Sequence, residues 1–246
     1  LHDIGIHPRS QARILSGIKS FFHFLTVADY LETDPSELLE GPKIGFKIPE
    51  VLTVEEIDRI ISAVDMDKKE GQRNRAILET LYSCGLRVSE LCNLKLSDLY
   101  FEEGFIKVEG KGSKQRLVPI SPRAIKEIKY WLTDRNLGKI KKGYEDYVFL
   151  ARWGNNISRI MVFHMIKELA EKTGITKNIS PHTFRHSFAT HLLEGGANLR
   201  AIQCMLGHES IATTEIYTHI DRNMLRSEII EHHPRNIKYR KERGIY

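Results

Sequence analysis

Residues 180–219 read SPHTFRHSFATHLLEGGANLRAIQCMLGHESIATTEIYTH, a stretch that gathers histidines around an arginine and a tyrosine. Glycines at positions 195, 196 and 207 interrupt its helical pattern, so we expect the chain to fold back on itself there. Such a fold brings several cationic groups and one phenol into a single pocket. Its members are His182, Arg185, His186, His191, His208, Tyr217 and His219. Arginine and histidine around a tyrosine suit an anion held beside a nucleophile, and phosphate is the anion that most often needs such a clamp.

One alternative for this pocket is a metal site. His182 and His186 stand four residues apart on one helical face, which is a spacing that zinc ligands use. However, the chain has no His-Glu-x-x-His motif and few carboxylates near these histidines, so we expect neither a metal nor a cofactor. A second alternative is structural, with His186, His191 and His219 capping helices or filling polar gaps.

The third interpretation is covalent phosphoryl transfer by Tyr217. A phenol has a pKa of about 10, so it needs a base or strong anion stabilisation to attack at neutral pH. In this scheme two guanidiniums clamp the non-bridging oxygens of a phosphodiester, and a mobile lysine protonates the leaving 5′ oxygen. The candidate set is Arg87, Lys111, His182, Arg185, His208 and Tyr217. A tyrosine in a helix is more often core or surface than a nucleophile, so the residue types alone leave the choice open.

The two distant members of this set come from well-defined local patterns. Arg87 follows a helix that Gly85 ends. Lys111 stands between two glycines at the tip of a β-hairpin, which the alternation over 105–109 and 115–120 predicts. The turn lacks the Gly-x-x-x-x-Gly-Lys-Ser/Thr spacing of a P-loop, so the pattern indicates a hairpin tip and not a nucleotide site.

Helix-start signals dominate the rest of the chain. Residues 53–56 (TVEE) form a capping box, and Ser121-Pro122 and Ser180-Pro181 each pair an N-cap with a proline at the first helical position. Residues 41–49 (GPKIGFKIP) hold two glycines and two prolines, which is typical of a linker. The sequence therefore predicts a mainly α fold with a small antiparallel β-sheet (α+β), divided into residues 1–48 and residues 49–246.

Composition limits the class of protein. The chain has 246 residues, a net charge of +5 and three cysteines without a Cys-x-x-Cys motif. An odd number of widely spaced cysteines is typical of reduced thiols, so we expect a cytoplasmic protein. No apolar run approaches the roughly 18 residues that a membrane span needs. The first residue is Leu1, not Met, and we expect that the sequence starts partway through a domain.

Five separate blocks of sequence resemble the tyrosine recombinase (phage integrase-like) family, and most closely its Xer-type members. They are Gly85–Leu91 (GLRVSEL), Gly110–Gly112 with Lys114 and Arg116, His182–His186 (HTFRH), Leu206–His208 (LGH) and Thr213–His219 (TTEIYTH). The order and spacing of the five blocks make the resemblance specific, whereas no single block would. It implies a tyrosine recombinase catalytic domain, preceded by part of a helical core-binding domain.

The resemblance implies a role for each central residue. Tyr217 would be the nucleophile, forming a 3′-phosphotyrosyl link and freeing a 5′-hydroxyl. Arg87 and Arg185 would hold the scissile phosphate. Lys111 would protonate the leaving 5′ oxygen.

Three further positions receive roles from the same resemblance. His182 would act in proton transfer with the nucleophile, and His208 would hydrogen-bond the phosphate. Glu90 resembles the acid that accompanies the first arginine in this family and orders the pocket around it.

DNA contacts are expected outside the catalytic pocket as well. The basic face of the first predicted helix supplies Arg9, Arg13 and Lys19, and the hairpin supplies Lys114 and Arg116. Phosphate contacts of this kind position a protein on duplex DNA.

The function implied is site-specific DNA recombination through a Holliday junction. The resemblance implies a double-stranded recombination site and a homo- or hetero-tetramer on two duplexes, and it leaves open whether a partner recombinase or an accessory activator is needed. It leaves open chromosome dimer resolution and the integration or excision of a mobile element. It also implies that residues 231–235 dock on a neighbouring protomer. Two rivals remain: a type IB topoisomerase-like nicking and closing enzyme, and a DNA-binding regulator without catalysis.

Overall fold

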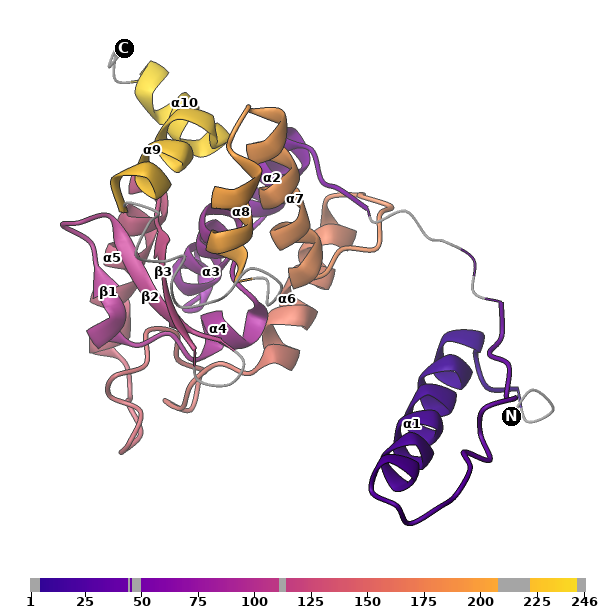
Figure 1. Ribbon diagram of the computed structural model, residues 1–246. Helices are drawn as coiled ribbons and strands as arrows, with labels where there is room; N and C mark the ends of the chain where they lie inside the picture. Colours follow the sequence, from indigo (N-terminus) through magenta and orange to yellow (C-terminus); the bar gives the residue numbers. More distant parts are fainter. Residues whose placement is uncertain (1–4, 44, 46–49, 111–113, 208–221, 243–246) are drawn as a thin grey trace. The chain divides into compact units, whose positions relative to one another are not determined.

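The computed structural model describes residues 5–43, 45, 50–110, 114–207 and 222–242 (Figure 1). The chain forms two compact units, residues 1–48 and residues 49–246. It is mainly helical with one three-stranded antiparallel sheet, which confirms the predicted α+β class. Among the described residues, no helix combines the length and the apolar character needed to cross a bilayer.

The first unit contains α1 (Pro8–Val27). The elements of the second unit, in chain order, are α2 (Val54–Ser62), α3 (Gly71–Cys84), α4 (Val88–Cys92), the 3-10 turn η1 (Leu96–Asp98), β1 (Leu99–Tyr100), β2 (Phe105–Glu109), β3 (Gln115–Pro119), α5 (Pro122–Leu137), α6 (Arg159–Lys172), α7 (Pro181–Glu194), α8 (Leu199–Leu206), α9 (Arg222–His232) and α10 (Pro234–Glu242).

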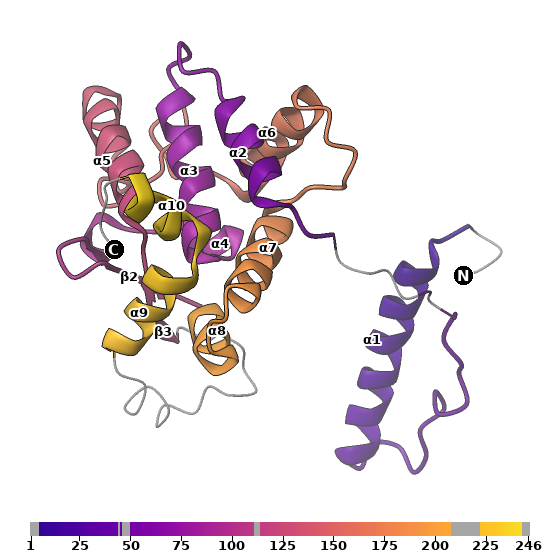
Figure 2. The same ribbon diagram turned by 90° about the horizontal axis from the view of Figure 1, so that it is seen from above.

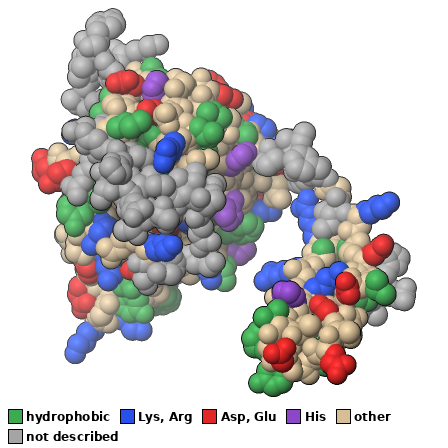
Figure 3. Space-filling view, viewed as in Figure 1, with side chains coloured by type: hydrophobic (Ala, Val, Ile, Leu, Met, Phe, Trp, Pro, Cys, Tyr) green, Lys and Arg blue, Asp and Glu red, His purple; other side chains and the backbone are tan. Residues whose placement is uncertain are grey.

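Helix α1 is amphipathic and buries none of its residues. Phe21, Phe24 and Val27 are exposed, and hydrophobic side chains are visible on the surface of this unit (Figure 3). Within the described part of this unit, the apolar stripe of α1 therefore has little to pack against.

Helix α3 is the central element of the second unit. It packs against α5 and α7, and Figure 2 shows it between these two helices. Nearly all of its side chains are buried, including the apolar Leu78 and Leu81, and α7 adds Phe184 and Phe188 to the same core. The helix that ends just before Arg87 and the helix that carries Arg185 are thus fixed by one hydrophobic core.

The predicted helix starts are confirmed by their hydrogen bonds. Thr53 Oγ1 accepts from the backbone N–H of Glu56 at 3.2 Å, and Glu56 Oε2 accepts from that of Thr53 at 2.8 Å, which completes the capping box. Ser121 caps α5 through the N–H of Ala124, with Pro122 at the first helical position. Each cap satisfies amide groups that have no partner within the helix.

The predicted hairpin is confirmed as β2 and β3, which pair antiparallel with Val108 opposite Arg116. Strand β1 was not predicted, and its two residues pair with the first two residues of β2. β3 contacts both α8 and α9, so the sheet is joined to the helices that flank residues 208–221.

Residues 231–235, which are expected to dock on a neighbouring protomer, also contact the rest of their own unit. Arg235 lies at the start of α10 and is 1% exposed within its own unit. Its guanidinium is ion-paired with Asp58, and its Nε donates to Glu79 Oε2 at 3.0 Å. The planar group also lies over the Tyr82 ring, 5.1 Å from its centroid. These contacts hold the segment against α2 and α3.

His233 makes the stability of the second unit depend on pH. The ring is fully buried, with Nε2 at 3.2 Å from the Tyr82 carbonyl oxygen, and burial lowers its pKa to about 3. The unfolded chain, with a histidine pKa of about 6.5, then binds one more proton than the folded chain between about pH 6.5 and pH 3. Stability from this group is full above pH 6.5 and declines by about 1.4 kcal/mol per pH unit below it.

We expect the His233→Gln variant to be less sensitive to acid than the wild-type protein. Between pH 7 and pH 5, its free energy of unfolding should fall by about 2 kcal/mol less than that of wild type. Urea unfolding at the two pH values measures this difference. His164→Gln, at an exposed position on α6, serves as the control and should follow wild type. Equal slopes for wild type and His233→Gln would contradict the assignment.

Candidate functional site

Arg87 is placed by the end of one helix and the start of the next. Gly85 ends α3 with φ 57° and ψ 34°, a left-handed conformation that favours glycine. A Cβ at Gly85 would lie 2.4 Å from Cδ1 of Phe188, so the close packing of α7 also requires glycine there. Arg87 then occupies the N-cap position of α4, where its backbone N–H donates to Glu90 Oε2 at 2.7 Å.

Among the described residues, the Arg87 side chain has two hydrogen-bond partners. Nη1 donates to Glu90 Oε1 at 2.9 Å, and Nη2 donates to the Gly207 carbonyl oxygen at 3.0 Å. The side chain is still 37% exposed. It borders a cleft of about 680 Å³ whose lining includes Glu90, Lys107 and Gly110. The Arg87 guanidinium is therefore held in place by two hydrogen bonds, while part of the side chain stays open to solvent.

Arg185 lies one turn into α7 and is buried at 8% exposure. Nη1 donates to the Gly85 carbonyl oxygen at 2.6 Å, and Nη2 donates to that of Leu206 at 2.5 Å. These carbonyls lie at the ends of α3 and α8, where the intrahelical bonds stop. The guanidinium thus links two helix C-termini.

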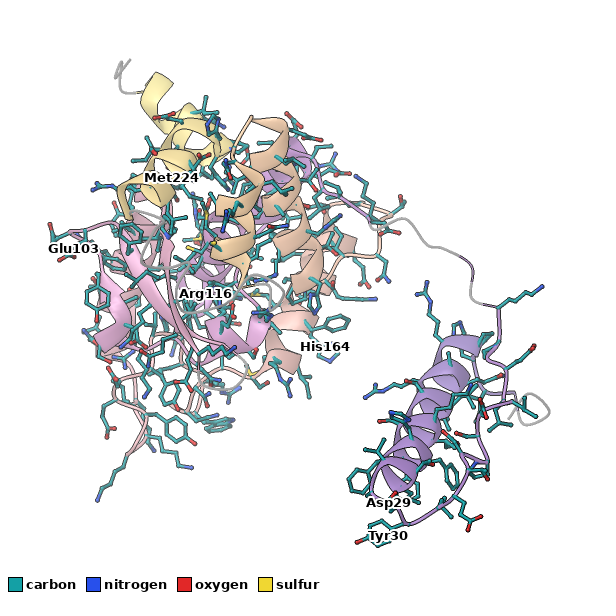
Figure 4. The ribbon with its side chains drawn as sticks, viewed as in Figure 1. Asp29, Tyr30, Glu103, Arg116, His164 and Met224 are labelled. Atoms are coloured by element: carbon teal, nitrogen blue, oxygen red, sulfur yellow. The ribbon has the colours of Figure 1, made fainter. Side chains whose placement is uncertain are left out.

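A third arginine completes the group. Arg116 on β3 donates from Nε to the Met205 carbonyl oxygen at 2.8 Å. Its Nη1 and Nη2 donate to Glu90 Oε1 and Oε2 at 2.7 and 2.9 Å, so the carboxylate is bound by both oxygens. Figure 4 shows Arg116 where the sheet meets α8.

Three arginines therefore bind three consecutive carbonyls at the C-terminal end of α8, residues 205–207. The negative end of the helix dipole favours cations at this place. Arg87, Arg116 and Arg185 carry three positive charges, and Glu90 is the carboxylate that contacts all three guanidiniums. The cluster keeps an excess of positive charge, which suits the binding of an anion.

The pKa values of Arg185 and Glu90 reflect the same excess of positive charge. Burial, with the nearby positive charge of Arg87 as the next cause, lowers the pKa of Arg185 to about 10. Burial acts to raise the pKa of Glu90, but hydrogen bonds and charge from Arg116 and Arg87 outweigh it, so the pKa lies below its usual value. At neutral pH Arg185 is protonated and Glu90 is ionised, and an additional negative charge would relieve the repulsion between the arginines.

The structure brings together Arg87, Arg185 and Glu90, three of the predicted site residues. His182 is exposed in the first turn of α7, three residues before Arg185. Lys111, His208 and Tyr217 lie outside the described residues. His191 is buried, and its Nδ1 lies 2.8 Å from the Tyr82 hydroxyl.

The structure corrects the prediction that Arg116 contacts DNA. Arg116 is 6% exposed, and all three of its guanidinium nitrogens bind partners inside the protein. The alternation of β3 already indicates this, because Arg116 has the parity of Val118 and Ile120, which are buried. Lys114, two residues earlier in the chain, is exposed.

The basic residues of α1 differ in their surroundings. Arg9 and Arg13 are exposed, one turn apart, and therefore share a face of the helix. Lys19 is half-buried, and its Nζ donates to the Glu37 carbonyl oxygen at 3.2 Å. Over the described ranges, no group of three or more His, Cys, Asp or Glu side chains is arranged to hold a metal ion.

Comparison with known proteins gives consistent matches. The sequence model of the phage integrase family matches residues 50–224. The tyrosine recombinase XerD of Staphylococcus saprophyticus is 43% identical over 235 residues, covering 96% of this chain and 80% of the relative. The XerA recombinase structure is 34% identical with a TM-score of 0.60, covering 89% of this chain and 75% of that one. The structure of XerH bound to its difH substrate is 26% identical with a TM-score of 0.68, covering 89% and 64%.

Proposed function

Because this chain belongs to the phage integrase family of tyrosine recombinases, we propose that it performs site-specific recombination by cutting and rejoining DNA through Tyr217. The observation that carries the proposal is the arginine cluster. Arg87 and Arg185 both lie beside the Glu90 carboxylate, and they donate to the consecutive carbonyl oxygens of Gly207 and Leu206. The arginines of the cluster carry more positive charge than this one carboxylate balances. This is an arrangement suited to a phosphodiester.

The chemistry of the proposal needs no external energy source. The Tyr217 oxygen bonds to phosphorus, its proton passes to His182, and the bond from phosphorus to the 5′ oxygen breaks. Lys111 gives a proton to that oxygen. Negative charge grows on the two non-bridging oxygens, where Arg87 and Arg185 stabilise it most strongly in the transition state. Attack by a 5′-hydroxyl reverses these steps and reseals a strand.

The remaining roles follow from position. His208, directly after the Gly207 carbonyl that Arg87 binds, donates a hydrogen bond to the phosphate in this scheme. Lys114, exposed beside the hairpin tip, contacts the DNA backbone. We expect the protein to act in the cytoplasm, where chromosomal DNA lies.

The first unit is proposed to be part of a helical core-binding domain. Its exposed Arg9 and Arg13 supply two charges for DNA phosphates on one helical face, while Lys19 adds a weaker contribution because Glu37 already engages its ammonium. The XerH structure, solved with its difH substrate, supports duplex DNA as the partner.

Recombination requires two sites, so the proposed assembly is a homo- or hetero-tetramer on two duplexes that passes through a Holliday junction. The proposal leaves open whether this assembly needs a partner recombinase or an accessory activator. Chromosome dimer resolution and the movement of a genetic element remain alternative settings for the same chemistry.

Covalent capture tests the proposed function. Purified protein is incubated in EDTA with sheared chromosomal DNA of its source, denatured in detergent, and the DNA that stays attached is sequenced. We expect one recurring sequence, attached through its 3′ phosphate. Two labelled duplexes carrying that sequence should then exchange strands. Relaxation of supercoils at scattered sequences without exchange would favour the type IB-like alternative, and DNA binding without any attachment would favour the regulator.

A further inference from the structure

Arg116 is a buried arginine that is connected to both Arg87 and Arg185. These two arginines, which are proposed to hold the scissile phosphate, are called the phosphate clamp. It binds both oxygens of Glu90, and Glu90 in turn binds the side chain of Arg87. Its Nε binds the Met205 carbonyl oxygen, the first of the three carbonyls that end α8. The other two carbonyls in that run accept from Arg185 and Arg87.

We propose that Arg116 is a positioning residue for the reaction, one that keeps Glu90 from neutralising the phosphate clamp. The inference rests on the proposed function, because it concerns the same phosphate pocket. Arg116 does not touch the substrate in this account. Its charge offsets the carboxylate of Glu90, and the charges of Arg87 and Arg185 remain available to the scissile phosphate.

The geometry indicates what the carboxylate would do without this partner. Glu90 Oε1 is already 2.9 Å from Arg87 Nη1, and Oε2 is 3.9 Å from Arg185 Nη1. At such distances in a buried site, opposite charges attract strongly. Without Arg116 the ionised Glu90 would pair with the two clamp arginines, and it would compete with the phosphate for the same donors.

Arg116 also supports the turn that leads into the catalytic segment. Gly207 has φ 65°, and a Cβ there would lie 3.2 Å from Cδ, Nε and Nη1 of Arg116. The guanidinium therefore packs directly against the backbone of this turn. A shift of about 1 Å in a catalytic group can cost on the order of 10²-fold in rate, so the support of the turn matters for catalysis.

Arg135 supplies a matched control. It is buried at 3% exposure, and it donates from Nε to the Tyr147 carbonyl oxygen at 2.9 Å and from Nη2 to that of Glu145 at 2.5 Å. Among the described residues, its guanidinium donates to the backbone carbonyls of Tyr147 and Glu145 and to the side-chain amide oxygen of Asn136. Loss of Arg135 removes a buried guanidinium without releasing a catalytic carboxylate.

The test uses single-turnover formation of the covalent adduct on the captured DNA site, with DNA affinity measured separately. We expect Arg116→Met to slow adduct formation on the order of 10²-fold while the Kd for DNA changes only a few-fold. Arg116→Lys keeps the positive charge and should lose less. Arg135→Met should lower the unfolding temperature and leave the adduct rate of the folded protein near that of wild type.

The adduct rate of a double variant distinguishes a positioning role of Arg116 from a purely structural one. Glu90→Gln removes the competing charge and keeps an acceptor for the Arg87 N–H, so Glu90→Gln with Arg116→Met should react at least about tenfold faster than Arg116→Met alone. A purely structural role for Arg116 predicts no such recovery.

Several outcomes would overturn the inference. They are a wild-type rate in Arg116→Met, a double variant no faster than Arg116→Met, or an equal loss in Arg135→Met. If Arg116→Met fails to fold, the comparison of Arg116→Lys with and without Glu90→Gln decides in the same way. Absence of an adduct in wild type itself would instead count against the proposed function.

Discussion

Arg185→Ala is expected to slow DNA cleavage on the order of 10³-fold while DNA affinity stays within a few-fold of wild type. In the proposed reaction, further negative charge develops on the non-bridging oxygens as Tyr217 attacks, so a clamp arginine contributes most in the transition state. In the proposed complex, duplex binding depends on many phosphate contacts, and Arg185, which is buried, adds little to it. Arg87→Ala should behave in the same way.

The change at Arg185 also leaves the carbonyls of Gly85 and Leu206 without their side-chain donor, which costs about 1–3 kcal/mol of stability if they stay unpaired. Thermal unfolding must therefore accompany the rate measurement. A substrate with an uncharged methylphosphonate at the scissile position separates the two effects. On this neutral substrate Arg185→Ala should lose much less activity relative to wild type, because the charge that the clamp stabilises is reduced.

Arg87→Ala and Arg185→Ala should impair cleavage much more than DNA binding. If DNA binding and cleavage fell together in Arg87→Ala and Arg185→Ala, the two arginines would be binding residues and not a transition-state clamp. An undiminished defect on the methylphosphonate substrate would point to folding and not to phosphate chemistry.

Local signals in the sequence were enough for much of the fold. The capping box at Thr53 and the left-handed glycine at Gly85 depend on a few neighbouring residues, and the structure confirms both. The hairpin register follows from an alternation of period two on either side of a glycine-rich turn. Each of these features is determined by residues close together in the chain.

The parts that sequence reasoning missed depend on contacts between distant residues. The three carbonyls at 205–207 are backbone groups, and no residue type marks them as ligands for arginines. Arg116 was assigned to DNA because it is basic and near the hairpin tip, although the parity of β3 places it on the buried face. Here the periodicity was a better guide than the charge.

The burial of Arg235 in the C-terminal segment is a second feature that sequence reasoning missed. Nothing in the sequence around Arg235 marks it as buried, yet it lies against Glu79 and Asp58. Glu79 falls in the interior of α3, where an unpaired carboxylate would be costly. A carboxylate in the buried part of a helix predicts a cationic partner, but the sequence does not say which arginines supply it.

Tyr217→Phe is expected to abolish covalent attachment to DNA entirely. The substitution removes one oxygen, and with it the atom that bonds to phosphorus. Phenylalanine keeps the aromatic ring, so the fold and DNA affinity should be unchanged. Tyr130→Phe is the matched control, because Tyr130 is an exposed tyrosine on α5 and its loss should leave the adduct intact.

A nicked suicide duplex in EDTA provides the most direct measurement. Once the strand is cut, the short piece beyond the nick diffuses away and the covalent complex accumulates as a protein–DNA band that resists detergent. The wild-type protein and Tyr130→Phe should both form this band without divalent metal, and Tyr217→Phe should form none. A band retained in Tyr217→Phe, or one that appears only when magnesium is added, would contradict a metal-independent tyrosine nucleophile.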